Sequence, residues 1–233
     1  MIAALDHLVV GGPAADYETL LGRRAVDGRL RTDNVAVRFE PEASGLRSMV
    51  FSTQDLAKAA TLLERRAVAT TRTEAGLDLL GHGVAIGIVA KPDQAPSPLT
   101  TDAGAAVSSL DHVVVRTPNP ERAIAFYGGR LGLDLRLDRS NPKWGARLLF
   151  FRCGDLVVEI AHDLKKGVSD EPDHLWGLSW RVPDIAAAHV RLKAAGLDVS
   201  EPRDGRRPGS QVCTVKNGTG GVPTILIGGV GRW

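Results

Sequence analysis

SSLDHVVVRTPNPERAIAFYGGRLGLDL, residues 108–135, reads as a strand, a helix and a second strand. Asn119 is predicted to cap the helix, and Pro120 suits its first turn because the missing N–H would have no partner there. Gly128 and Gly129 are expected to end the helix in a left-handed turn. The first strand carries one histidine, His112, which is either a buried polar residue of the core or a ligand.

The same order of elements occurs a second time along the chain. ALDHLVV, residues 4–10, matches SLDHVVV, residues 109–115, and a strand–Asp–helix–strand pattern recurs at residues 48–68 and 177–199. Internal similarity of this kind indicates repeated structural units. The interval between the histidine and the second pattern is shorter in the first half, which is therefore expected to lack most of a β-hairpin.

The repeat predicts an α+β fold. We expect tandem βαβββ modules, four in all, with the first abbreviated. Residues 1–90 and 110–233 form the two predicted domains. Residues 91–109 are rich in Pro, Ala, Ser and Thr and are predicted to be a linker.

Composition excludes several classes of function. The chain of 233 residues is 43% hydrophobic, which suffices for a large core, and its formal charge of +2 favours neither nucleic acid nor an anionic membrane. Only two cysteines are present, too few for a disulfide framework, and the first residues do not resemble a signal peptide, so a cytoplasmic location is expected. No phosphate-binding loop occurs, so no nucleotide cofactor is expected.

The segments LDHVVVRTPNPERAIAFYGGRLGLDL, GDLVVEIAH and LSWRVPDIAAAHVRLKAAGLDV resemble the vicinal oxygen chelate superfamily, which includes glyoxalase I, extradiol dioxygenases and bleomycin-resistance proteins. The resemblance implies paired modules that form a half-open barrel around a small-molecule site. It also implies four positions for metal ligands, on the first and fourth strands of each paired module. A divalent metal needs three or four such groups at about 2.0–2.3 Å.

In the second half, two of these four positions carry ligand residues. His112 stands at the first position and Glu159 at the second, whereas Gly177 and Ile225 (or its neighbour Thr224) stand at the other two. His174, three residues before Gly177, is the best substitute for the third ligand. The candidate metal ligands are therefore His112, Glu159 and His174, for Fe, Mn, Ni or Zn.

The first half is predicted to be free of metal. His7 is present, but Arg38 stands at the Glu position, and an arginine cannot bind a metal. Ser48 and Gly87 fill the other two positions. Pairing of modules across the halves is an alternative, and it would bring Ser48 and Gly87 beside the ligands of the second half.

Other side chains are candidates for contact with a ligand in the cavity. Strand alternation places Ser179 and Arg181 on the face of Gly177, whereas Trp176 and Trp180 are expected in the core. Trp144, near a hairpin, is placed to cover the cavity, and Arg38 is a candidate in the first half. The basic loop RDGRRPGSQ, residues 203–211, would bind a carboxylate or phosphate if it lay at the cavity mouth.

Two functions fit these observations. The first is an enzyme of the glyoxalase or ring-cleavage dioxygenase type, a lyase or isomerase, in which a divalent metal is held by His112 and Glu159. Glu159 and Arg181 are its candidate catalytic residues, and a metal-free enzyme would use Glu159 as base and Arg181 as electrostatic stabiliser. The alternative is a metal-free binding protein of the bleomycin-resistance type. Each acts on a small molecule, and a homodimer is compatible with both.

Overall fold

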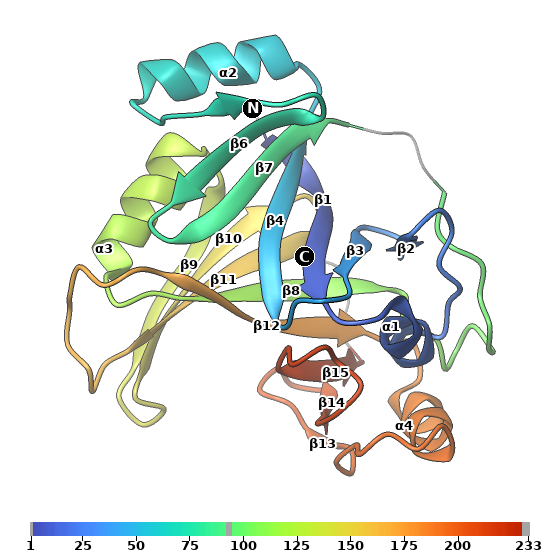
Figure 1. The fold of residues 1–233 in the computed structure, drawn as a ribbon. Helices are drawn as coiled ribbons and strands as arrows, with labels where there is room; N and C mark the ends of the chain where they lie inside the picture. Colours follow the sequence, from blue (N-terminus) through green and yellow to red (C-terminus); the bar gives the residue numbers. More distant parts are fainter. Residues whose placement is uncertain (1, 92–94, 230–233) are drawn as a thin grey trace.

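The computed structural model describes residues 2–91 and 95–229 and contains two mixed β-sheets, one from each half of the chain (Figure 1). The first sheet has seven strands in the order β2-β3-β1-β4-β7-β6-β5. The first half consists of β1 (Ile2–Gly11), α1 (Ala14–Leu21), β2 (Arg29–Arg31), β3 (Ala36–Glu40), β4 (Leu46–Thr53), α2 (Leu56–Arg65), β5 (Thr71–Arg72), β6 (Gly76–Gly81) and β7 (Val84–Ala90).

The second sheet has eight strands in the order β13-β14-β15-β12-β8-β11-β10-β9. The second half consists of β8 (Ser109–Arg116), α3 (Pro120–Ala123), η1 (Ile124–Arg130), β9 (Asp134–Asn141), β10 (Ala146–Cys153), β11 (Leu156–Asp163), β12 (His174–Arg181), α4 (Ile185–Ala194), β13 (Arg203–Asp204), β14 (Gln211–Val215) and β15 (Thr224–Gly228). The predicted α+β class is confirmed. The first module is abbreviated as expected. Two strands, β2 and β3, lie between α1 and β4, whereas three strands, β9, β10 and β11, lie between η1 and β12.

The register of the strands shows that the two halves are equivalent. Glu159 and Gly177 both pair with the residue two positions after His112. Arg38 and Ser48 both pair with the residue two positions after the first-half histidine. The expected alignment of the halves is therefore confirmed, and pairing of modules across the halves is wrong, because each half forms its own sheet.

The predicted helix caps are present, but one predicted helix end is wrong. The side chain of Asn119 accepts a hydrogen bond of 3.0 Å from the backbone N–H of Arg122 at the start of α3. The helix does not end at Gly128 and Gly129, because α3 continues into the π-helix η1, which contains both glycines. The left-handed residue that follows is Gly132, with φ of +77°.

One hydrophobic core extends through both halves. Residues 92–94 of the predicted linker lie outside the described residues, and the rest of it forms hydrogen bonds with both halves, for example between Asp184 N–H and the carbonyl oxygen of Gly104 in the second half. Arg23 donates hydrogen bonds to the carbonyl oxygens of Ser97 and Val107, each at 3.0 Å. No helix within residues 2–91 and 95–229 is long and apolar enough to cross a membrane.

Candidate functional site

A cavity of about 1050 Å³ lies against the second sheet. His112 on β8, Glu159 on β11, Gly177 on β12 and Ile225 on β15 all line it. The four positions that the resemblance implies thus converge on one space, although only two of them carry a polar side chain. Much of the remaining wall is apolar, including Leu137, Leu148, Phe150, Val212 and Ile227.

His112 and Glu159 face each other in this cavity. The Nε2 atom of His112 is 3.6 Å from Oε2 of Glu159, and their side chains are 16% and 14% exposed. The parallel pairing of β8 with β11 produces this contact, because His112 pairs with Val157 and Glu159 follows on the same face. An acid and a base are therefore within reach of one bound molecule.

Asp111 fixes the state of His112. The Oδ2 atom of Asp111 lies 2.8 Å from Nδ1 of His112, and Oδ1 accepts a hydrogen bond of 2.8 Å from Nε of Arg181. Burial raises the pKa of Asp111, but the bonds and charges of His112 and Arg181 outweigh it and hold this pKa below its ordinary value.

The tautomer of the imidazole follows from this contact. Because an ionised carboxylate only accepts hydrogen bonds, Nδ1 of His112 is the donor to Asp111. In the neutral imidazole, Nε2 then carries a lone pair and faces the carboxylate of Glu159. This contact is attractive only with a cation between the two atoms, either a proton or a metal ion.

The donors present do not fit a resident catalytic metal. Such sites use three protein ligands, and within the described residues no group of three His, Cys, Asp or Glu side chains is placed to hold an ion. A Cβ atom at Gly177 would lie 2.8 Å from the carbonyl oxygen of Pro223, so a ligand side chain has no room there. Ile225 presents only an apolar group to the cavity.

The first half repeats the Asp–His pair without the cavity. Nδ1 of His7 lies 2.7 Å from Oδ2 of Asp6, and both residues are buried. Arg38 is exposed on β3 and is not among the residues that line the large cavity. The arrangement in the first half therefore brings neither His7 nor Arg38 to the ligand space of the second half.

The remaining predicted residues lie at different distances from the cavity. Ser179 pairs directly with His112, and its buried hydroxyl has no hydrogen-bond partner among the described residues. Arg181 lies behind the cavity wall, where it binds Asp111 and donates to the carbonyl oxygen of Asp155 at 2.9 Å. Its geometry is that of a residue that positions Asp111.

His174 and Trp144 differ in their position relative to the cavity. His174 is exposed at the start of β12 and does not line the cavity. Burial and the charge of Arg116 lower its pKa. Trp144 does line the cavity and is 43% exposed. The structure therefore brings together His112, Glu159 and Trp144 around one space, whereas His174 and Arg38 lie outside it.

Two features of the wall were not predicted correctly from the sequence. Trp180 is buried as expected, but Trp176 is 38% exposed and lines the cavity, because a register shift between Leu175 and Gly177 interrupts the alternation of β12. Asp111 was missed altogether. The signal for it was the Asp–His dipeptide, which occurs at the same place in both halves.

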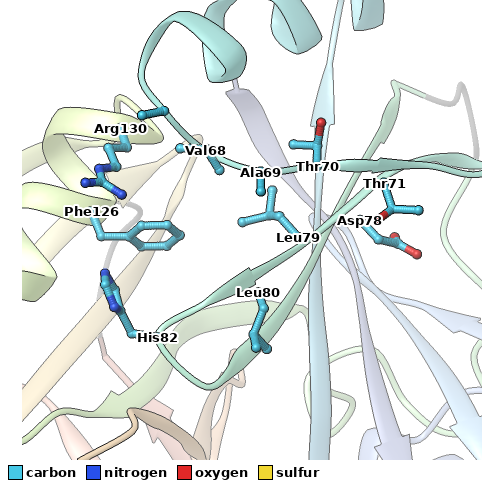
Figure 2. Close-up of a pocket in the computed structure, with 11 residues that line it drawn as sticks. Val68, Ala69, Thr70, Thr71, Asp78, Leu79, Leu80, His82, Phe126 and Arg130 are labelled. Carbon is cyan, nitrogen blue, oxygen red and sulfur yellow. The ribbon is translucent and has the colours of Figure 1, made fainter. Parts of the chain in front are cut away.

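A second hollow, of about 490 Å³, lies between β6 and η1 (Figure 2). Phe126 lies there between Arg130 and His82, with its ring edge-on to His82 at 5.3 Å, and Asp78 lies at the other end. Burial and the charge of Arg122 lower the pKa of His82. Because its acid and base do not face each other, we assign the reactive site to the larger cavity.

The chain is similar to known proteins in sequence and in fold. A family model described as Glyoxalase/Bleomycin resistance protein/Dioxygenase superfamily matches residues 111–214, which include both His112 and Glu159. A curated relative, the ethylmalonyl-CoA/methylmalonyl-CoA epimerase of Cereibacter sphaeroides, is 28% identical over 109 residues, which are 42% of this chain and 81% of that protein.

Solved structures match the whole chain. The halotolerant catechol dioxygenase BphC superposes with a TM-score of 0.74 at 15% identity, over 100% of this chain and 89% of that one. The 2,3-dioxygenase LapB from Pseudomonas sp. KL28 does so with 0.73 at 17%, over 100% and 95%. At such identities the likeness concerns the fold. Residues 111–214 therefore match the model of the Glyoxalase/Bleomycin resistance protein/Dioxygenase superfamily, and the whole chain shares its fold with these solved structures.

Proposed function

We propose that this protein is an enzyme that binds a small organic carbonyl compound in the large cavity and transfers a proton on it with Glu159 and His112. The observation that carries the proposal is the contact of 3.6 Å between Nε2 of His112 and Oε2 of Glu159 inside the cavity. Epimerisation beside a carbonyl is one such reaction, and the name of the relative from Cereibacter sphaeroides supports it.

In the proposed step, the carboxylate of Glu159 removes a proton from the carbon next to the carbonyl group, and the electron pair of the broken C–H bond moves into the enolate. Nε2 of His112 accepts a hydrogen bond from the protonated Glu159, because Asp111 keeps the other ring nitrogen in the donor state. The planar enolate then takes up a proton at the same carbon, which restores the starting compound when the proton comes to the same face and epimerises the carbon when it comes to the opposite face. General acid–base catalysis of this kind contributes about 10²–10⁴-fold to a rate.

A divalent metal ion, instead of a proton, could lie between His112 and Glu159, because their side chains face each other at 3.6 Å. His112 and Glu159 would hold it, and it would polarise the carbonyl oxygen of the ligand. The donor set argues against this version, because two protein ligands are fewer than catalytic sites use, and ring-cleavage chemistry needs two histidines and a carboxylate. We therefore propose a metal-independent reaction.

Hydrogen exchange tests the proposal. Methylmalonyl-CoA and simpler thioesters and ketones are incubated with the protein in D2O, and exchange at the carbon beside the carbonyl is followed by NMR. We expect exchange that chelators do not affect, that falls about 10²–10⁴-fold in Glu159→Gln, and that falls also in His112→Ala. The exposed Glu171 provides the control Glu171→Gln, which should leave the rate unchanged.

Three outcomes would contradict the proposal. Hydrogen exchange that persists in Glu159→Gln would show that Glu159 is not the base. Exchange that chelators abolish and added metal restores, with metal content lost in His112→Ala, establishes the metal version instead. Binding of these compounds in a thermal-shift assay without any exchange indicates a binding protein of the bleomycin-resistance type.

A further inference from the structure

The mouth of the large cavity is bridged by side chains from the two opposite edges of the second sheet. Strands β9 and β13 stand at the two ends of the strand order. Trp144 lies in the turn after β9, and Arg206 follows β13. The guanidinium carbon of Arg206 is 4.4 Å from the centre of the Trp144 ring, and that of Arg139, on β9, is 5.3 Å from it. We call Arg139, Trp144 and Arg206 the mouth clasp.

The mouth is strongly basic. The cavity is lined by five cationic residues: Arg139, Arg203, Arg206, Arg207 and Lys216. Asp204 is the acidic residue of the same loop. Lys216 is paired with Asp198 at 3.2 Å, but neither Arg139 nor Arg206 forms an ion pair with any residue that the structure describes. Excess positive charge therefore gathers at the opening of a cavity whose walls are largely apolar.

Both guanidinium groups lie over the Trp144 ring and have no hydrogen bond or ion pair among the described residues, so their N–H groups are available to a ligand. A guanidinium stacks through its planar face and donates hydrogen bonds from its rim, in a fork that matches carboxylate and phosphate groups. The indole ring holds both groups in place by cation–π attraction, which reduces the entropy lost when they bind an anion. The clasp is thus preorganised for an anionic group.

The charges also define a direction inside the cavity. Glu159 repels an anion, and the apolar wall formed by residues such as Leu148 and Phe150 offers no partner for one. A ligand with an apolar body and one anionic end gains most when the anionic end lies at the clasp. Its other end then points toward Glu159 and His112.

We propose that Arg139, Trp144 and Arg206 determine specificity by binding a phosphate or carboxylate group of the ligand at the cavity mouth. The clasp thereby selects organic anions with an apolar body and sets which end of the ligand reaches Glu159. The proposal rests on the proposed function only in that both place the ligand in the same cavity.

Calorimetric binding of phenyl phosphate, benzoate and benzyl alcohol tests the clasp, because the three probes share a ring and differ in charge. We expect both anions to bind more tightly than the alcohol, and the stronger of the two identifies the preferred group. Arg206→Gln and Arg139→Gln should each weaken anion binding about 10-fold or more and leave benzyl alcohol unchanged. Trp144→Leu should weaken anion binding as well, since it removes the stacking surface.

Arg136→Gln is the matched control. Arg136 lies on β9, the strand that carries Arg139, but it does not line the cavity and is paired with Asp134 at 3.0 Å. Its replacement should therefore leave anion binding unchanged. Circular dichroism confirms that each variant is folded. The proposal is overturned if neither anion binds, if the arginine variants bind the anions like wild type, or if benzyl alcohol binding falls equally. Because binding is measured without turnover, the clasp and the proton transfer can each fail while the other stands.

Discussion

At the scale of single residues, Asp111 decides what His112 can do. It is 1% exposed and receives hydrogen bonds from His112 on one oxygen and from Arg181 on the other. A buried carboxylate is stable only when it is paired in this way. The sequence places Asp, His and Arg on neighbouring strands, but only the fold brings Arg181 to Asp111, because β12 runs antiparallel to β8.

We predict that Asp111→Asn lowers the free energy of unfolding by about 3 kcal/mol near neutral pH, because it leaves the guanidinium of Arg181 buried without its counter-charge. The pKa of Asp111 in the folded state lies below the ordinary value of 3.8. Its contribution to stability is therefore complete above pH 3.8 and is lost as the pH falls through the lower, folded-state pKa.

Urea unfolding at a series of pH values checks this prediction, with the exposed Asp134→Asn as control. The difference between wild type and Asp111→Asn should be constant around neutrality and should narrow below pH 3.8. A difference that widens on acidification would mean that the carboxyl group of Asp111 is protonated in the folded protein.

At the scale of elements, β12 shapes the cavity through its departures from regularity. Register shifts against β8 occur between Leu175 and Gly177 and between Ser179 and Trp180. The first turns Trp176 to the cavity, and the glycine that follows lets Pro223 approach closely. Strand alternation predicts none of this, because one extra residue in a strand reverses the face of every later side chain.

We predict that Gly177→Ala and Gly129→Ala change stability in opposite directions. The new Cβ at position 177 would lie 2.8 Å from the carbonyl oxygen of Pro223, so the strand must shift, at a cost of about 1–3 kcal/mol. At Gly129, in η1, no heavy atom lies within 4 Å of the position that a Cβ would take, and alanine should stabilise the helical segment by about 0.4–1 kcal/mol. Denaturant unfolding measures both, and equal effects at the two sites would refute the close contact.

At the scale of the whole molecule, side chains of one half bind the backbone of the other. Arg191 on α4 donates hydrogen bonds to the carbonyl oxygens of Thr19 and Leu20 at the end of α1, and to that of Ala105. Figure 1 shows α1 and α4 on the same side of the molecule. Burial lowers the pKa of Arg191, and the three carbonyl groups accept hydrogen bonds from its guanidinium group.

We predict that Arg191→Met, which keeps an apolar stem, lowers the free energy of unfolding by about 2–3 kcal/mol, because carbonyl groups at the end of α1 lose a charged donor. Lys193→Met, at an exposed position of the same helix, is the control and should have little effect. Urea-induced unfolding gives the free energy of unfolding of both variants. Equal stability of the two variants would show that solvent replaces the donor.

How far the sequence predicts this protein depends on the range of the interactions involved. The repeat, the module order and the helix cap at Asn119 are local patterns, and the structure has them as expected. The resemblance to a known superfamily assigned His112 and Glu159 to the cavity, and both line it. The prediction that the helix ends at Gly128 was wrong, because packing of η1 against β9 and β10 overrides the tendency of glycine to end a helix.

The sequence by itself determined the repeated modules, because repeats and strand period are local patterns. Its resemblance to a known superfamily identified His112 and Glu159 as cavity residues, and Gly177 and Ile225 as the positions without a ligand side chain. Only the tertiary structure decided that Arg181 binds Asp111, that Pro223 closes the space beside Gly177, and that Arg206 meets Trp144 across the mouth. These contacts join residues that are distant in sequence, and they depend on strand register and sheet curvature, which no local pattern encodes.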